Sequence, residues 1–278
     1  MANPILNDKA MNEANEAGYA SGKWGPPRPL TRSTAIPEGM ADGPISTWHS
    51  ETMTVQGTAT ATGVLFVVLM VAAAVGWSLV KVQGGEVSQF PVWTIAGVLV
   101  GFGCVIGMRF KPQLAKPLGF IYAIAEGIFV GAISHAYEGY QKGIVVEAVG
   151  VTVAVFGVML FLYSTHILKV TERMRKIVIG ATLGVMIFYG ISLLINLFGG
   201  GVSFLGANDT SAFSIGFSLF VAALAAFNLA LNFDFIERGA KAGLPKQMEW
   251  VAAVGLMVTI IWLYLEILRL LAKLNSRR

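Results

Sequence analysis

Long apolar runs separated by short polar connections occupy the chain from Thr60 onward. A helix needs about 20 mainly apolar residues to cross the hydrocarbon core of a membrane. Seven runs approach or meet this length, and we expect each to form one spanning helix. Because the connections are short, the predicted fold is all-α, a polytopic membrane protein with a seven-transmembrane-helix bundle. The approximate bounds of the spans are 60–80, 91–108, 117–136, 144–168, 177–198, 212–235 and 250–271.

The start of the chain follows a different pattern. Residues 1–58 are polar, rich in small residues, and contain three prolines in the segment KWGPPRPL. Neither helical nor strand periodicity is visible there, which is typical of a disordered segment. The sequence therefore predicts a disordered cytoplasmic tail over 1–58 and a transmembrane domain over 59–274.

Composition supports the membrane class. Of the 278 residues, 55% are hydrophobic and only 13% charged, with a mean hydropathy of +0.67, which is too apolar for a water-soluble globule. The net charge of +4 comes with basic residues gathered in short loops between apolar runs, so we expect a lipid bilayer and no nucleic acid as partner. The single cysteine, Cys104, excludes an intrachain disulfide and a paired-cysteine metal site.

The charges of the connections predict an orientation. Lysine and arginine are concentrated after the second, fourth and sixth runs, whereas the alternate connections hold at most one. By the positive-inside rule, the basic connections and the N-terminal tail are cytoplasmic in a multi-pass protein of the cell membrane. Seven spans then place Lys273, Arg277 and Arg278 outside, against the rule. Either this end is too short and too late to set topology or the last run does not cross completely, and we favour a full crossing because 250–271 is long enough.

Small residues four positions apart predict where helices pack closely. Such pairs occur in the second, third and fifth runs, and small side chains let helix backbones approach one another in lipid. We expect helix contacts, rather than a binding function, at Gly97/Gly101, Gly103/Gly107, Gly127/Gly131 and Gly180/Gly184.

Acidic side chains inside the apolar runs are the candidate functional residues. A carboxylate at the centre of a membrane helix costs roughly 2.5–3.5 kcal/mol, so such acids mark functional sites by default. From the helical rise, Glu126 lies about 15 Å beyond Lys116, near mid-bilayer, and Glu266 about 24 Å beyond Trp250. Asp234 ends the sixth run.

Two further acids, Glu147 and Glu249, lie near the ends of runs, where they could simply reach water. The sequence shows no lysine or arginine deep enough to neutralise all five acids. Carboxylates spread between the two faces of a membrane are typical of a cation or proton pathway.

No arrangement typical of a membrane-embedded enzyme is present. The last run lacks the lysine that a retinal Schiff base requires. Asp234 is the only aspartate inside any run, whereas an intramembrane aspartyl protease needs two. Neither a Gly-x-Ser-Gly motif with a deep histidine nor a His-Glu-x-x-His zinc motif occurs. We therefore expect no enzymatic activity, no cofactor and no bound metal beyond a permeant cation.

Three segments together resemble one membrane-protein family. These are GFIYAIAEGIFVG at 119–131, the pair Phe233-Asp234 that closes the sixth run, and LYLEILRLL in the seventh. They are similar to the Bax inhibitor-1 family, also called transmembrane Bax inhibitor motif proteins, in a bacterial version. The resemblance covers about residues 53–274. It implies seven helices with the last one central, and a pH-sensitive leak of calcium.

The resemblance also implies roles for individual residues. One acid on the sixth helix and one on the seventh act in the family as proton sensor and gate. Glu266 corresponds to the seventh-helix acid, where the family carries aspartate. The sixth-helix acid corresponds to Asp234, with Asn232 or Asn228 at that place in other alignments. A family arginine near the third helix, thought to latch the acids, corresponds to Lys116 or Arg109.

The spacing leaves the pairing of the acids open. Straight antiparallel helices would separate Asp234 from Glu266 by about 27 Å along the axis. Either residues 246–254 lie along the membrane surface before the helix enters, which shortens this offset, or Asp234 pairs with Glu249 and Glu266 faces Asn228, Glu126 or Glu147. If two carboxylates share a site, like-charge repulsion favours one shared proton near neutral pH, and its loss on alkalinisation would push the two helices apart.

These observations predict a cation leak, with calcium as the permeant ion, gated by protonation of intramembrane carboxylates. An alternative from another class is a membrane-embedded regulatory or binding partner of a membrane protease or stress-response complex, for which the tail over 1–58 is the characteristic feature. A proton-coupled transporter is a third possibility, although no inverted repeat or pair of broken helices supports it.

Overall fold

The structure of the protein is a computed structural model that describes residues 52–80, 82–83, 86–87, 93–197 and 211–276. The chain divides into two units, Met1–Trp48 and His49–Arg278, and the described residues all belong to the second. The predicted tail lies outside the described residues as far as residue 51. Its last residues belong instead to the folded unit, because Met53 is buried and the first helix begins at Val55.

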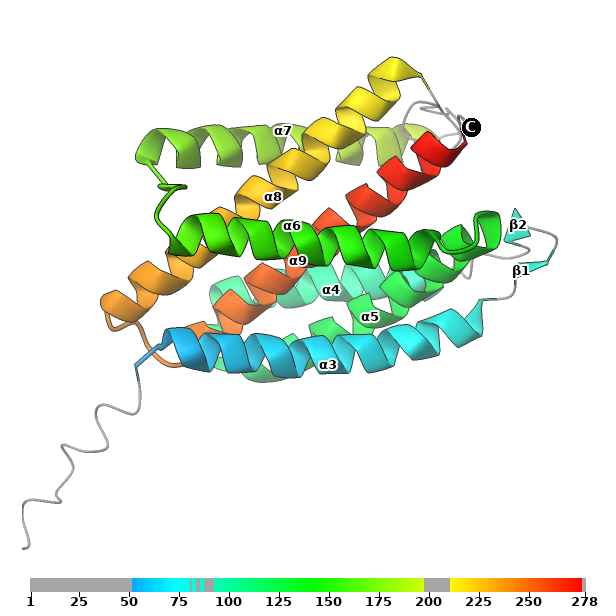
Figure 1. Cartoon of the computed structure of the whole chain (residues 1–278). Coiled ribbons are helices and arrows are strands. Elements are labelled where there is room, and N and C mark those ends of the chain that lie inside the picture. Colours follow the sequence, from blue (N-terminus) through cyan, green and yellow to red (C-terminus); the bar gives the residue numbers. More distant parts are fainter. Residues whose placement is uncertain (1–51, 81, 84–85, 88–92, 198–210, 277–278) are drawn as a thin grey trace, which may run out of the picture. The chain divides into compact units, whose positions relative to one another are not determined.

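Helices make up nearly all of the described chain (Figure 1). Apart from a two-residue antiparallel pairing of β1 (Val82–Gln83) with β2 (Glu86–Val87), the described elements are helical. They are α3 (Val55–Leu79), α4 (Trp93–Phe110), the 3-10 helix η2 (Pro112–Leu114), α5 (Ala115–Tyr140), α6 (Ile144–Ser164), α7 (Glu172–Leu197), α8 (Ala212–Lys241) and α9 (Met248–Asn275).

The helices confirm the predicted polytopic membrane fold. Within the described ranges, six helical segments are long and apolar enough to cross a membrane, and α4 adds a shorter apolar segment, Ala96–Phe110. The predicted count of seven spans therefore depends on α4. Each predicted run overlaps one of these helices, and the bounds differ by at most six residues at either end.

Local sequence signals account for several helix ends. Thr54 precedes α3 and accepts a hydrogen bond from the backbone N–H of Gly57, and Ser211 caps α8 in the same way through Ser214. Gly243 follows the end of α8 with a φ of 64°, a left-handed conformation that glycine adopts without a steric penalty. The turn that it allows brings α9 back against α8.

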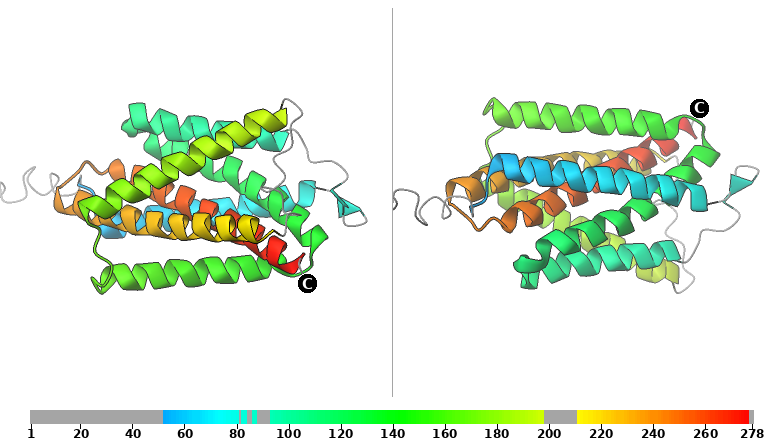
Figure 2. Two further views of the ribbon diagram at one scale, coloured as in Figure 1. Left: turned by 90° about the horizontal axis from the view of Figure 1, so that it is seen from above. Right: turned by 90° about the horizontal axis from the view of Figure 1, so that it is seen from below.

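The last helix lies at the centre of the bundle. α9 packs against α3, α5, α6 and α8, and the views of Figure 2 show it running among them. Of its most apolar stretch of 18 residues, 67% is buried, compared with 11% in α7. The predicted central position of the last helix is thus confirmed. α7, by contrast, lies at the periphery.

Lys273 is part of this bundle rather than of a polar loop. Its side chain is fully buried in the last turns of α9, where the ammonium donates a 3.0 Å hydrogen bond to the hydroxyl of Ser218 in α8. A lysine held between helices is not a loop charge of the kind that the positive-inside rule counts. Lys273 therefore does not count against the predicted orientation, whereas Arg277 and Arg278 lie outside the described residues.

Glycines bring α3 and α5 into backbone contact. A Cβ at Gly131 would lie 1.9 Å from the carbonyl oxygen of Ala73, and one at Gly127 would lie 2.5 Å from that of Leu69. The Gly127/Gly131 pair is therefore a helix contact, as predicted. The Gly97/Gly101 pair of α4 faces α5 in a similar way. No described atom would meet a Cβ at Gly103, Gly180 or Gly184, so the prediction is wrong for the last pair.

Gly131→Ala is expected to lower the free energy of unfolding by about 1–3 kcal/mol, because the obstructing atom belongs to the backbone of α3 and cannot rotate aside. Thermal unfolding of the purified protein in detergent would measure this. Gly180→Ala is the matched control: its Cβ would meet open space, and alanine in a helix interior gains up to about 1 kcal/mol over glycine. Equal unfolding temperatures for both variants would contradict the proposed contact.

Candidate functional site

One face of α7 carries three polar side chains that point toward other helices. Arg175, Thr182 and Tyr189 are seven residues apart, and seven residues are close to two turns of an α-helix, so the three lie in a row. The row extends over about 21 Å, against a hydrocarbon core of about 30 Å. Each of the three side chains contacts a polar group on α8 or α9.

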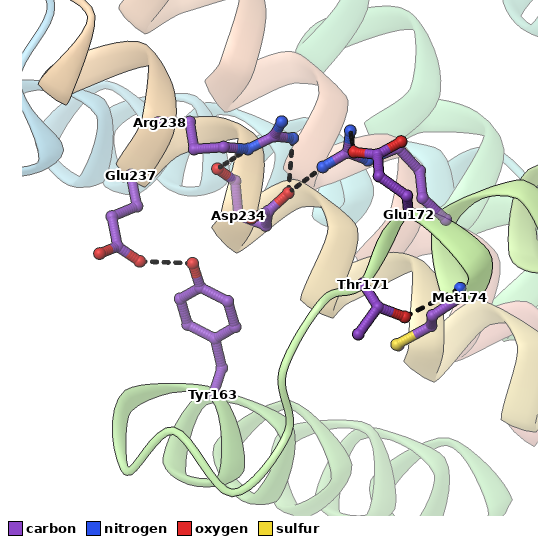
Figure 3. Close-up of polar contacts among 8 residues, drawn as sticks. Tyr163, Thr171, Glu172, Met174, Asp234, Glu237 and Arg238 are labelled. Atoms are coloured by element: carbon purple, nitrogen blue, oxygen red, sulfur yellow. Dashed lines mark hydrogen bonds and ion pairs between the residues drawn. The ribbon is translucent and has the colours of Figure 1, made fainter.

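At the first position, Arg175 forms an ion pair with Asp234 of α8. The distance from Nη2 of Arg175 to Oδ2 of Asp234 is 2.9 Å, and the Asp234 side chain is only 13% exposed. Arg238, one turn further along α8, forms a second ion pair with the same oxygen, and Glu172 pairs with Arg175 at the surface. Figure 3 shows these contacts around Asp234. Two arginines from different helices thus neutralise one carboxylate.

At the second position, Thr182 forms a hydrogen bond with another neutral side chain. Asn228 of α8 donates from Nδ2 to the hydroxyl of Thr182, at 2.8 Å. One turn along α8, Asn232 donates instead to the hydroxyl of Thr259 in α9, at 2.7 Å. The two asparagines therefore connect α8 to different neighbours.

At the third position, Tyr189 meets Glu266 of the central helix. The Tyr189 hydroxyl donates a 2.8 Å hydrogen bond to Oε1 of Glu266, and Arg269 lies 3.0 Å from the same oxygen. Arg269 also donates to the Tyr189 hydroxyl at 2.8 Å and lies over the tyrosine ring. Glu266 is 1% exposed. Its charge is therefore held from a buried position by Tyr189 and Arg269, which are themselves partly exposed, and Arg269 also contacts Tyr137.

We call these three contacts together the polar seam. The seam joins the face of α7 to α8 and α9 at three depths and contains three of the residues that the sequence singles out. Its members are Arg175, Thr182 and Tyr189 of α7, Asn228 and Asp234 of α8, and Glu266 of α9.

Apolar packing of α7 is limited beside this seam. Val178 and Val185 of α7 are buried in a small cluster with Val221 and Leu224 of α8, separate from the main core around α9. Most of the apolar side chains of α7 are exposed, such as Ile187 at 63%. The polar contacts therefore carry a larger share of the attachment of α7 than is usual for a packed helix.

Glu249 lies apart from the seam. Its Oε1 accepts hydrogen bonds from the backbone N–H and the hydroxyl of Thr54, both at 2.9 Å, which fastens the start of α3 to the start of α9. The predicted pairing of Asp234 with Glu249 is therefore wrong. Glu126, in α5, is partly buried against Gly101 of α4 and is not among the partners of Glu266. Glu147 is exposed on the first turn of α6.

The two predicted latch residues also lie elsewhere. Lys116 stands 5.4 Å from the centre of the Trp250 ring, in a cation–π contact at the start of α5. Arg109 is exposed in the last turn of α4. Neither forms an ion pair with a described residue. The cations that hold the acids are Arg175, Arg238 and Arg269.

These placements correct the predicted mechanism of proton sharing. Asp234 and Glu266 contact different partners, and each faces a cation rather than a second carboxylate. Arg269 and Arg238 could have been found in the sequence, because side chains three or four residues apart meet on one face of a helix. Arg175 could not, because it is 59 residues from Asp234. No group of three His, Cys, Asp or Glu side chains that could hold a metal ion occurs in the described part of the chain.

Comparison with known proteins identifies relatives at the family level. The family model described as Bax inhibitor 1 like matches residues 3–276, nearly the whole chain. No curated protein and no solved structure matches the chain significantly.

Proposed function

The chain belongs to the Bax inhibitor 1 like family, and on this premise we propose that it is a membrane-embedded cation leak gated by the carboxylates of the polar seam. Calcium is the permeant ion that the family resemblance favours. The observation that supports the proposal most is the row of three polar contacts between α7 and the helices α8 and α9. A polar row of this length inside an apolar bundle can become a water-lined path when the helices separate.

In the proposed closed state both acids are ionised. Asp234 holds Arg175 and thereby ties α7 to α8, while Glu266 holds Tyr189 and ties α7 to α9. The arginines neutralise both carboxylates, so a permeant cation finds no free negative charge in this state. Because α7 has little apolar packing, these polar contacts are what keep it against α8 and α9.

Opening follows when a carboxylate gains a proton. A neutral carboxyl group no longer forms an ion pair with Arg175 or Arg269, so the contacts that need the ionised acid are present at higher pH and weaken as the pH falls. α7 then separates from α8 and α9 and uncovers the polar side chains. The proposed leak therefore increases on acidification, the opposite of the sign that a proton shared by two carboxylates would give.

Calcium flux in proteoliposomes containing the full chain tests this proposal. We expect flux above that of protein-free liposomes, rising about tenfold as both carboxylates become protonated, which corresponds to about 1.4 kcal/mol of lost closed-state stability. Encapsulated calcium dye reports the flux over a series of pH values. Flux that equals that of empty liposomes, or that does not change with pH, would refute the leak.

A second candidate is a regulatory partner of another membrane protein, such as a membrane protease. The observation in its favour is that the family match begins at residue 3 and thus includes the unit Met1–Trp48, which a leak does not need. Deleting residues 2–48 separates the two functions: a leak keeps its flux and its pH response in liposomes. Loss of a cellular phenotype with unchanged flux would favour the regulatory function.

A further inference from the structure

An apolar groove of about 460 Å³ lies between α7 and α8, beside the polar seam. Side chains from both helices line it, including Met174, Ile177 and Ala181 of α7 and Phe220, Ala223 and Phe227 of α8. The spacing of three and four residues on each helix shows that the groove follows one face of each. Its lining is apolar throughout, as contact with an acyl chain requires.

A polar pocket of about 270 Å³ lies at the end of the same two helices. It is formed by the end of α6, the connection to α7 and the last turns of α8, and its lining includes Tyr163, His166, Lys169, Asp234, Arg238 and Lys241. Glu237 completes the charged lining; it accepts a hydrogen bond from Tyr163, as Figure 3 shows, and pairs with Lys241.

The pocket and the groove share no lining residue, but they follow each other along α8 and the start of α7. On α8, Phe227 of the groove and Asp234 of the pocket are seven residues apart on one face, with about 10 Å of rise between them. Val170 of the pocket and Met174 of the groove are four residues apart, where α7 begins. A phospholipid occupies half of a bilayer about 40–45 Å thick, so a headgroup in the pocket places its acyl chain alongside the groove.

The charges of the pocket favour an anionic headgroup. Three basic residues face two acids, and both acids already have basic partners: Asp234 pairs with Arg238, and Glu237 with Lys241. Lys169 is exposed and forms no ion pair with a described residue. Arg173, on the first turn of α7, is also exposed and forms no ion pair with a described residue. It adds a second uncompensated positive charge near the pocket.

We propose that an anionic phospholipid binds along α7 and α8, with its phosphate beside Lys169 in the polar pocket and one acyl chain in the apolar groove. Basic pockets between membrane helices bind such headgroups by charge, and the groove supplies the apolar contact. The lipid then packs against the helix that has little apolar support of its own. Binding does not depend on whether the protein conducts ions.

Native mass spectrometry of the full chain in detergent tests the proposal, with phosphatidylglycerol and phosphatidylcholine of identical acyl chains as probes. We expect phosphatidylglycerol to bind at least about tenfold more tightly. The double variant Lys169→Gln/Arg173→Gln should lose about 25-fold in affinity for phosphatidylglycerol, roughly fivefold for each charge, with phosphatidylcholine unchanged. Both positions are exposed, so the variant is expected to fold.

Two controls complete the experiment. Lys142→Gln removes an exposed charge from the connection between α5 and α6 and should leave both affinities unchanged. Ala223→Trp fills the groove and should weaken both lipids together. The proposal would be overturned if the two lipids bound equally, or if the double variant kept the preference for phosphatidylglycerol. It would also be overturned if free glycerol phosphate bound as tightly as the lipid.

Discussion

Replacing Asp234 by asparagine is expected to raise calcium flux at neutral pH about tenfold and to remove most of the response to acidification. Asparagine keeps the size of the side chain but carries no charge, so the ion pair between α7 and α8 at this depth is lost and at most a weaker hydrogen bond to Arg175 remains. The carboxylate is 13% exposed, and a shielded ion pair contributes more than a surface pair. Flux into dye-loaded proteoliposomes measures both effects.

The exposed neighbour of Asp234 provides a matched control. Glu172→Gln removes a carboxylate from the same arginine at a side chain that is 71% exposed, and leaves the link between α7 and α8 in place. It should leave flux unchanged. Arg175→Gln should raise flux as Asp234→Asn does, and the double variant should add little, because both substitutions break one contact. Fully additive effects would show that the ion pair does not hold the closed state.

Replacing Glu266 by glutamine is expected to lower the free energy of unfolding by about 3–5 kcal/mol. Removal of one partner from a buried ion pair leaves the other charge uncompensated. Here Arg269 would lose its carboxylate partner and keep neutral hydroxyl partners, those of Tyr189 and Tyr137, beside the central helix. Chemical unfolding in detergent micelles measures the loss. Flux through the variant should also rise, because Tyr189 no longer has a carboxylate to hold.

A double variant tests whether the loss of stability comes from the charge left on Arg269. Glu266→Gln/Arg269→Gln removes both charges and should regain much of the lost stability, since no charge is then left buried. The flux of the double variant should stay high and keep the part of the pH response that Asp234 supplies. If Glu266→Gln unfolds like the unchanged protein, the buried network does not stabilise the bundle, and its proposed role in holding α7 fails.

Helical spacing predicts some features of the candidate acids correctly. The rise per residue correctly indicates that Asp234 and Glu266 do not contact each other, and it places Glu266 deep in the last helix. The same spacing places Arg269 on the helix face of Glu266 and makes it a candidate partner, but only the structure shows that its guanidinium contacts the carboxylate. An arginine three residues from a buried acid should therefore be considered first among the possible partners of that acid.

The lengths and hydrophobicity of the apolar runs determine the membrane class and the helices of this protein, because a spanning helix satisfies its backbone hydrogen bonds within one segment. The resemblance at Glu266 likewise indicates the family and the central last helix. Only the tertiary structure decides that α7 presents Arg175, Thr182 and Tyr189 to α8 and α9. The partners lie 59, 46 and 77 residues away along the chain, and no local periodicity relates residues at such separations. The polar seam is therefore a property of helix packing. The acids that stand out in the sequence supply one side of its contacts, and the polar residues of α7 supply the other.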